Sequence, residues 1–233
     1  MKLVDLAAIS RRHFFFFVDK CNKIYRSGHD LAFYRDLIAM HRETNNLAAL
    51  IDDDDFLVKI YNTLEEWDMN KRGARMTSFA VLKESVKFWK NYLVELYDFK
   101  LYEDIDDKLT TINERLEKVF CNLQIMESKR KIVGVSKALH FLLPDLIMPI
   151  DSKYTMTAFY GYNRYAKTPK EEFKIFQEIF ERTMEITNRL QLSPLDVDDV
   201  QWKTSVPKLI DNAIIGLLNS DPEEVRELFN EKP

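Results

Sequence analysis

The sequence predicts an all-α protein, a compact domain of roughly eight to ten helices. Only five of the 233 residues are glycine, whereas glycine makes up about 7% of an average protein. Abundant Leu, Lys, Glu and Phe also favour helices. Apolar residues recur at three- and four-residue spacing in most segments, and no segment alternates apolar and polar residues as a half-buried strand does.

The predicted helices follow one another along the whole chain. Asp30 is expected to cap one of them, and Thr168, Pro169 and Glu171 form a capping box with proline at the first helical position. The acidic run 52–55 also precedes a helix, where negative charge is favourable, and it lacks the spaced ligands and glycine of a calcium loop. In order, the expected helices cover residues 2–26 (one helix, or two that meet near Ser10), 30–45, 56–64, 78–99, 104–123, 135–143, 168–192 and 207–217. A further helix is expected to start at residue 151, and a short one at residue 221.

Composition and charge limit the class of protein. With 233 residues, 46% hydrophobic and 31% charged, the chain is typical of a globular protein and can bury a sizeable core. We expect one all-α domain over residues 1–233, with a two-lobed arrangement of 1–125 and 126–233 as the alternative. The net charge of −4 is unlike the basic total of a dedicated nucleic-acid binder, although it leaves room for a local basic groove.

The cysteines and the N-terminal segment indicate a cellular location. Cys21 and Cys121 have no CxxC pattern and no nearby histidine pair, so we expect a reducing compartment, no metal site and no cofactor; a single disulfide stays open. Charged residues interrupt the segment after Met1, unlike a signal peptide. The apolar run 13–18 is too short to span a bilayer. These features predict a soluble, cytoplasmic protein without a membrane partner.

Four consecutive phenylalanines, at residues 14–17, cover most of a helix circumference. Such a segment is expected to be buried on several sides, either in the core or at an interface. The face that carries Phe14 and Phe17 is therefore the expected contact if the protein forms a homo-oligomer.

A basic turn at residues 67–75 is a candidate anion site. Lys71, Arg72 and Arg75 surround Gly73, where no helical periodicity requires them. Several cations beside free backbone N–H groups can hold a phosphate or a carboxylate. A solvated connector between two helices is the alternative interpretation.

Residues 131–160 gather rare residue types and are expected to form the centre of the fold. Gly134 permits a tight turn before a helix over 135–143, which Pro144 ends. An apolar segment follows, and Asp151 then begins the next helix. A carboxylate at such a position accepts hydrogen bonds from backbone N–H groups two or three residues on, which explains the aspartate without any catalytic role.

The same stretch contains, in order, the glycine segment Gly134-Val135-Ser136, then Lys137, an apolar helix, and Pro149-Ile150-Asp151. This order resembles the helix-hairpin-helix DNA glycosylase superfamily, although Ser136 replaces the second hairpin glycine and Lys137 falls one position early. The resemblance implies a glycosylase-like helical fold in which backbone amides near Gly134 and Ser136 bind phosphate. It also implies that Lys137 is the nucleophile of the lyase-competent branch and that Asp151 assists departure of the base.

A second resemblance extends over more of the chain, through residues 67–74, 134–140, 143–146, 149–155 and 202–211. These stretches are similar to a family of uncharacterised microbial proteins. The similarity implies a shared fold and supplies no activity.

Other polar residues of the central stretch allow two interpretations. His140, on an apolar helix, is either a core histidine or a base, and it shares a helix face with Lys137, three residues away. Lys153 and Tyr154 follow Asp151 directly. These three side chains form a cluster that could accept a phosphate or a flipped base.

The sequence leaves three functional hypotheses open. The first is a DNA-associated protein with a glycosylase-like core, which requires a pocket for an extruded base near Asp151 and salt-dependent phosphate contacts. The second is a non-enzymatic helical interaction protein. The third is a small-molecule or nucleotide enzyme that uses Lys137, His140 and Asp151. The basic face that the first hypothesis requires would consist of Lys71, Arg72, Arg75, Lys129, Arg130, Lys131 and Lys137.

Overall fold

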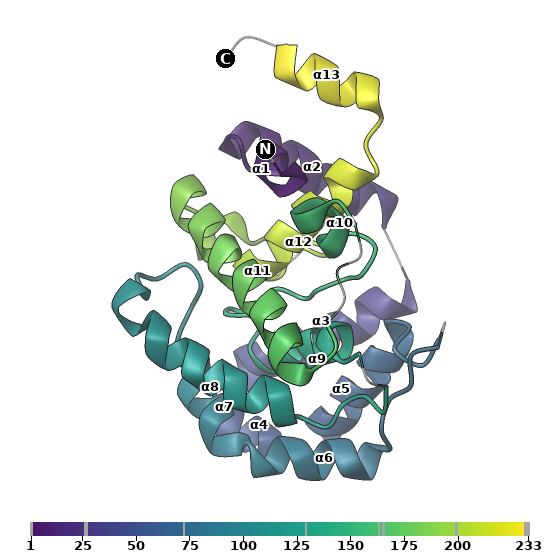
Figure 1. Ribbon diagram of the computed structural model, residues 1–233, viewed down its shortest axis with the longest axis vertical. Coiled ribbons are helices and arrows are strands. Elements are labelled where there is room, and N and C mark those ends of the chain that lie inside the picture. Colours follow the sequence, from purple (N-terminus) through teal and green to yellow (C-terminus); the bar gives the residue numbers. More distant parts are fainter. Residues whose placement is uncertain are drawn as a thin grey trace.

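The computed structural model describes residues 2–25, 28–71, 73–128, 130–162, 164, 166–198 and 200–230, and it confirms the all-α prediction. These residues form thirteen α-helices, two short 3-10 helices and no strand, apart from an isolated antiparallel bridge between Met76 and Met126. The elements (Figure 1) are, in order, α1 (Leu3–Ala7), α2 (Arg11–Ile24), α3 (His29–Thr44), α4 (Leu47–Asp52), α5 (Asp54–Glu66), α6 (Phe79–Phe88), α7 (Lys90–Tyr97), η1 (Asp106–Lys108), α8 (Leu109–Asn122), α9 (Ile132–Leu142), α10 (Thr155–Tyr160), α11 (Pro169–Leu190), η2 (Pro194–Asp196), α12 (Val206–Leu218) and α13 (Pro222–Asn230).

Several long predicted segments are divided, so more helices are present than expected. Residues 2–26 contain both α1 and α2, and Ser10 caps α2 by accepting a hydrogen bond from the backbone N–H of His13. Residues 78–99 contain α6 and α7, which meet at Trp89, where the backbone (φ −91°, ψ 7°) leaves the helical region.

The predicted caps are present at α5 and α11 but not at α3. Asp53 caps α5 and Thr168 caps α11, each by accepting a hydrogen bond from a backbone N–H group. At α3 the capping position is Gly28, and Asp30 lies in the first turn of the helix. The acidic run 52–55 therefore has the predicted role at a helix start, because Asp53 caps α5 and Asp54 and Asp55 lie in its first turn.

Helix α9 lies at the centre of the fold. From Gly134 to Leu142 every residue is buried, and α9 packs against α5 and α11 (Figure 1). The helix begins at Ile132, so Gly134 lies inside it and the predicted tight turn at this glycine is wrong. A Cβ atom at Gly134 would overlap Met126 Sδ, so a larger residue would force the side chain of Met126 to shift.

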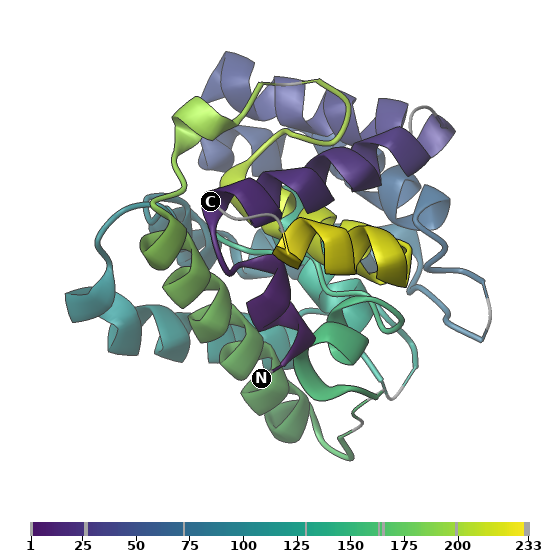
Figure 2. The ribbon, with the colours of Figure 1, turned by 90° about the horizontal axis from the view of Figure 1, so that it is seen from above.

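Helices from both ends of the chain pack together. Helix α2 lies along α12 (Figures 1 and 2), and a Cβ atom at Gly216 would overlap the backbone carbonyl oxygen of Phe17. Phe14 and Phe17 are fully buried, and Phe15 and Phe16 are partly buried. The core interpretation is therefore confirmed for Phe14 and Phe17, and the homo-oligomer stays a prediction.

Helix α11 is the longest of the described helices and is amphipathic. It buries Phe173, Phe176 and Phe180, and it packs against α8 and α9. None of the helices in the described ranges, α11 included, combines the length and apolar character that crossing a bilayer requires.

Candidate functional site

A pocket of about 250 Å³ opens where α2, α5, α9, α12 and the segment around Asp151 meet. Its size lies just below the range of about 300–1,000 Å³ that is usual for small-molecule sites. Four aromatic side chains and a lysine–aspartate pair characterise its surface. We call it the aromatic pocket, after its lining residues Tyr25, Trp67, Tyr154 and Trp202, with Lys208 and Asp211.

Trp67 and Trp202, which form one wall of this pocket, contact residues outside the pocket. Trp202 donates from Nε1 to the carbonyl oxygen of Tyr25 at 2.9 Å and from its backbone N–H to Asn22 Oδ1 at 3.1 Å. The ring of Tyr34 stacks on Trp202, with centroids 5.6 Å apart, and contacts Trp67 at 5.3 Å. The Trp67 and Trp202 centroids are 6.0 Å apart at an interplanar angle of 59°. This wall is therefore rigid before any ligand enters.

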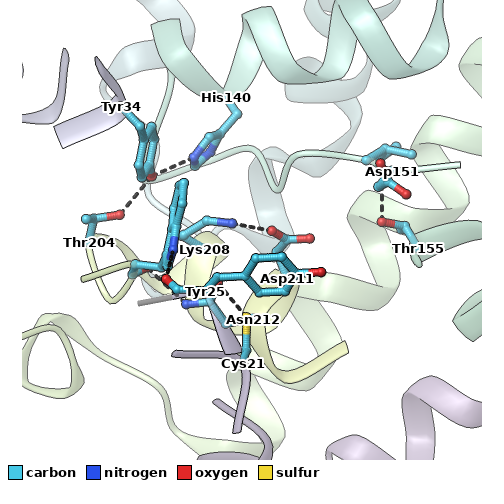
Figure 3. A network of polar contacts seen from close by, with 12 residues as sticks. Cys21, Tyr25, Tyr34, His140, Asp151, Thr155, Thr204, Lys208, Asp211 and Asn212 are labelled. Carbon is cyan, nitrogen blue, oxygen red and sulfur yellow. Dashed lines mark hydrogen bonds and ion pairs between the residues drawn. The ribbon is translucent and has the colours of Figure 1, made fainter. Parts of the chain in front are cut away.

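A buried ion pair from α12 forms another part of the surface (Figure 3). Lys208 Nζ lies 2.5 Å from Asp211 Oδ2, and the two side chains are only 6% and 5% exposed. The same Nζ lies 4.9 Å from the ring centroid of Trp202 and 5.3 Å from that of Trp67. Burial raises the pKa of Asp211, and the charge of Lys208 opposes that rise.

Lys137 reaches the same pocket from α9. It is 7% exposed, and its Nζ donates to the backbone carbonyl oxygen of Trp67 at 3.1 Å. No described carboxylate lies within ion-pair distance of this Nζ. Burial lowers the pKa of Lys137, while the charges of Asp151 and Asp211 partly oppose that fall. A larger share of the amine is therefore neutral than in an exposed lysine, which makes it a better nucleophile.

Asp151 lies at the start of the turn that precedes α10. Its Oδ1 accepts hydrogen bonds from the backbone N–H groups of Lys153 at 2.7 Å and Tyr154 at 3.1 Å, as the sequence predicted. Its own N–H donates to Thr155 Oγ1 at 2.9 Å (Figure 3). The helix itself begins only at Thr155, so Asp151 caps a turn and does not begin the helix. Among the described residues Oδ2 has no hydrogen-bonding partner, and Asp151 lines the aromatic pocket.

A second pocket of about 600 Å³ adjoins the first. Its surface contains Lys71, Arg130 and Arg164, so we call it the cationic pocket. Arg164, which the sequence did not single out, is ion-paired with Glu178 at 2.7 Å. The residues that line both pockets are Trp67, Asp68, Lys137 and Asp151.

Only part of the predicted basic face lies at these pockets. Lys71, which is ion-paired, and Arg130 line the cationic pocket. Arg75 is exposed and lines neither pocket. Arg72 and Lys129 lie outside the described residues. Of the predicted basic face, Lys71, Arg130 and Lys137 therefore line the cationic pocket.

The N-terminus of α9 is already occupied by an internal carboxylate. Glu172, which is 3% exposed, accepts from the backbone N–H of Lys131 through both oxygens, at 3.1 and 3.0 Å. Gly134 lines the cationic pocket, but Ser136 is fully buried and accepts a hydrogen bond from the Ile150 N–H at 3.1 Å. Ser136 thus joins two segments of the core and is not accessible to a phosphate.

His140 belongs to a polar network behind the pocket (Figure 3). Its Nδ1 lies 2.6 Å from the carbonyl oxygen of Ile147, and a carbonyl can only accept, so Nδ1 carries the proton. Burial lowers the pKa of His140 to about 3, so the ring is neutral and Nε2 accepts from the Tyr34 hydroxyl at 2.8 Å. Tyr34 in turn accepts from Thr204 at 2.8 Å. We call Tyr34, His140 and Thr204 the saturated network; His140 lines neither pocket.

Two tyrosines meet at the mouth of the aromatic pocket. The hydroxyls of Tyr25 and Tyr154 are 2.9 Å apart, and Lys153 Nζ donates to the Tyr154 hydroxyl at 3.2 Å. Burial raises the pKa of Tyr154, but the hydrogen bonds with Tyr25 and Lys153 outweigh that effect and lower its pKa overall. Tyr154 therefore lines the aromatic pocket together with Asp151, whereas Lys153 is exposed and lines neither pocket.

Three residues of the aromatic pocket were not predicted as site residues: Trp202, Lys208 and Asp211. Trp67 lies in the predicted basic turn but was not predicted to line a pocket. A usable signal exists for the ion pair, because Lys208 and Asp211 stand three residues apart in a largely apolar helix. The tryptophans have no comparable local signal.

No protein-family model, no curated protein and no solved structure matches this chain. As far as the described residues extend, no group of three or more His, Cys, Asp or Glu side chains is placed to hold a metal ion. The two pockets, with Lys137 and Asp151 between them, are therefore what a functional proposal has to explain.

Proposed function

We propose that this is a DNA-associated protein with a glycosylase-like core, which takes an extruded base into the aromatic pocket while phosphates of the strand lie over the cationic pocket. The observation that carries the proposal is that Lys137 and Asp151 line both pockets. We call these two residues the junction. In an extruded nucleotide the sugar connects the base to the phosphates, so the sugar would lie at the junction.

The aromatic pocket has the surface that a base requires. Enzymes that act on bases remove the base from the helical stack and hold it between aromatic or apolar side chains with hydrogen bonds to its edge. Stacking on an aromatic side chain contributes about 1–3 kcal/mol per base. Trp67 and Trp202 supply aromatic lining, and Asp211 offers an acceptor.

The aromatic pocket is lined mainly by negative charges and the cationic pocket mainly by positive charges, which is what the proposal needs. The aromatic pocket contains five carboxylates and two lysines, whereas the cationic pocket contains four Lys or Arg side chains and three carboxylates. Phosphates are therefore favoured on the cationic side. Glu172 already occupies the amides at the start of α9, so side-chain cations such as Arg130 would supply the phosphate contacts.

Lys137 and Asp151 have complementary roles in this proposal. As the base leaves, the bond between the base and the sugar carbon breaks and its electron pair goes to the base. The lone pair of Lys137 Nζ forms a new bond to the same carbon, and the proton that Nζ loses neutralises the departing base. The free oxygen of Asp151 stabilises the positive charge that develops on the sugar.

Borohydride trapping tests this proposal. A duplex with one abasic site is incubated with the protein and borohydride, which reduces an imine between a lysine and the sugar to a stable amine. We expect a covalent adduct with the wild-type protein and none with Lys137→Gln, which keeps a donor for the Trp67 carbonyl. Lys118→Gln, the same change at an exposed position of α8, should form the adduct normally. The proposal is wrong if the wild type forms no adduct or if Lys137→Gln forms it undiminished.

The acidic lining of the aromatic pocket favours a second candidate, an enzyme that acts on a free small molecule. Such an enzyme would use Lys137 and Asp151 but not His140, whose two nitrogens are both engaged. It would bind a free nucleoside as tightly as it binds a damaged duplex, whereas the leading proposal requires the duplex to bind far more tightly. Competition between the two ligands separates these candidates.

A further inference from the structure

We propose that Asp211 is a specificity-determining residue, which accepts a hydrogen bond from an N–H group on the edge of the ring that enters the aromatic pocket. The inference rests on the proposed function in that the ring is taken to be a nucleobase. It assigns the ligand to a chemical class: a planar heterocycle with an N–H donor on the edge that enters first.

The first observation is an unused oxygen. Asp211 Oδ2 is paired with Lys208, whereas Oδ1 has no hydrogen-bonding partner among the described residues. In the described ranges, three fully enclosed side-chain atoms have no hydrogen-bonding partner: His13 Nε2, Trp67 Nε1 and Asn113 Oδ1. Asp211 Oδ1 also has no partner but is not among these three atoms, so it is not fully enclosed. Asp211 is 3% exposed and lines the aromatic pocket, so this oxygen is reached from the pocket.

The second observation is that the carboxylate is fixed in place. Lys208 Nζ holds Oδ2 at 2.5 Å and lies over the rings of Trp67 and Trp202. A carboxylate that is paired with a cation accepts hydrogen bonds and does not donate them. The free oxygen therefore presents an acceptor in the pocket that Trp67 and Trp202 also line, before the ligand arrives.

The third observation is that Asn212 and the indole of Trp202 are already hydrogen-bonded, while the buried Trp67 Nε1, which is a donor, has no partner among the described residues. Asn212 donates from Nδ2 to the Trp202 carbonyl oxygen at 3.0 Å, and its Oδ1 accepts from Cys21 Sγ at 3.8 Å. The indole N–H of Trp202 donates to the carbonyl oxygen of Tyr25. In this part of the described pocket, Asp211 therefore supplies the free acceptor.

A ring with an N–H donor satisfies this oxygen, whereas a ring without one displaces water and leaves a buried acceptor unpaired. Leaving a buried charged group unpaired costs more than an ordinary hydrogen bond contributes. A site built to accept from a donor consequently rejects analogues that lack it. We expect a preference of about tenfold or more for a ring with the donor.

The test uses two pairs of probes that differ at one donor. The first pair is 9-methyladenine and 9-methylpurine, and the second is 1-methylthymine and 1,3-dimethylthymine. Binding to the wild-type protein is followed by quenching of the fluorescence of Trp67 and Trp202. A preference of about tenfold or more for the donor-bearing member in either pair supports the inference. A smaller preference in both pairs, or no binding of any probe, overturns it.

A double variant then tests the residue itself. Lys208→Met with Asp211→Leu replaces the whole ion pair by apolar side chains, because removing one partner alone would leave a buried charge uncompensated. We expect the two members of each pair to bind alike. The matched control is Lys87→Met with Asp54→Leu, at an exposed ion pair of 3.0 Å between α6 and α5, which should keep the wild-type preference. The inference is overturned if the Lys208/Asp211 variant keeps the preference for the probe with the N–H donor. If this variant does not fold, the binding of the probe pairs to the wild-type protein remains the test.

The two proposals can fail separately. A donor preference that depends on Asp211, without a borohydride adduct at Lys137, would support the inference and overturn the proposed function. An adduct at Lys137 without any donor preference would do the reverse.

Discussion

Lys137 and His140 lie one turn apart on α9, and both are buried, but their surroundings differ. His140 uses both ring nitrogens inside the saturated network, whereas Lys137 makes one hydrogen bond and reaches two pockets. Burial alone therefore does not separate the two residues. They differ in unused hydrogen-bonding capacity that faces a cavity, which is the property on which the proposed role of Lys137 rests.

The largest effect on stability is expected in the saturated network. His140→Ala removes two buried hydrogen bonds, leaves the Tyr34 hydroxyl and the Ile147 carbonyl without their partner, and creates a cavity. We expect the free energy of unfolding to fall by about 3–5 kcal/mol, measured by urea denaturation. A loss of under about 1 kcal/mol would show that the network is not a structural element.

The histidines also predict a pH dependence. Burial lowers the pKa of His140 to about 3 and that of His41 to about 4, against about 6.5 in the unfolded chain. The unfolded state therefore binds protons first as the pH falls, and stability that is present above pH 6.5 is lost below it. Between pH 6.5 and pH 5 we expect each histidine to lower the free energy of unfolding by up to about 1.4 kcal/mol per pH unit.

Urea midpoints at pH 7, 6 and 5 measure this slope. His29→Gln changes an exposed histidine and should leave the slope as in the wild type. A stability that does not change between pH 7 and pH 5 would contradict the burial and neutrality of both histidines.

Asp151 is expected to have a smaller structural role and a separable functional one. Asp151→Asn keeps an oxygen for the two backbone N–H groups of the turn, whereas Asp151→Ala removes it. We expect Ala to cost about 1 kcal/mol of stability and Asn only a few tenths. Both variants should yield less borohydride adduct, because the positively charged imine between Lys137 and the sugar would lose the nearby Asp151 carboxylate. Wild-type adduct yield in Asp151→Asn would restrict Asp151 to its structural role.

The smallest effect on stability is expected at Lys137. Lys137→Gln removes a buried amine that has no carboxylate partner within the described residues, and it keeps a donor for the Trp67 carbonyl. We expect the free energy of unfolding to change by less than about 1 kcal/mol, measured in the same urea experiment as His140→Ala. A loss as large as that of His140→Ala would remove the distinction between the two residues.

The helices are predictable from the sequence because their signals are local. Apolar spacing and the caps at Asp53 and Thr168 involve residues within one or two turns of each other. Gly134 shows where such signals mislead. A glycine followed by a helix indicates a turn, but here the glycine accommodates Met126, a contact between two segments that local spacing does not reveal.

The site is only partly predictable for the same reason. Lys137 and Asp151 stand close together in sequence and were recognised as candidates, and His140 was recognised with a core role as one alternative. Trp67 and Trp202 come from distant segments that meet only in the folded chain. Their contact with each other, and with Lys208, is a tertiary property that no local pattern contains.

Binding to a duplex with an abasic site, measured across a salt series, tests the central claim most directly. We predict that the logarithm of the affinity falls linearly with the logarithm of the salt concentration, because cations at the cationic pocket displace counterions from phosphates. Arg130→Gln should reduce the magnitude of this slope by about one, and Lys118→Gln, on α8, should not change it. An affinity no better than that of an acidic control protein, with a flat salt dependence, would contradict the account.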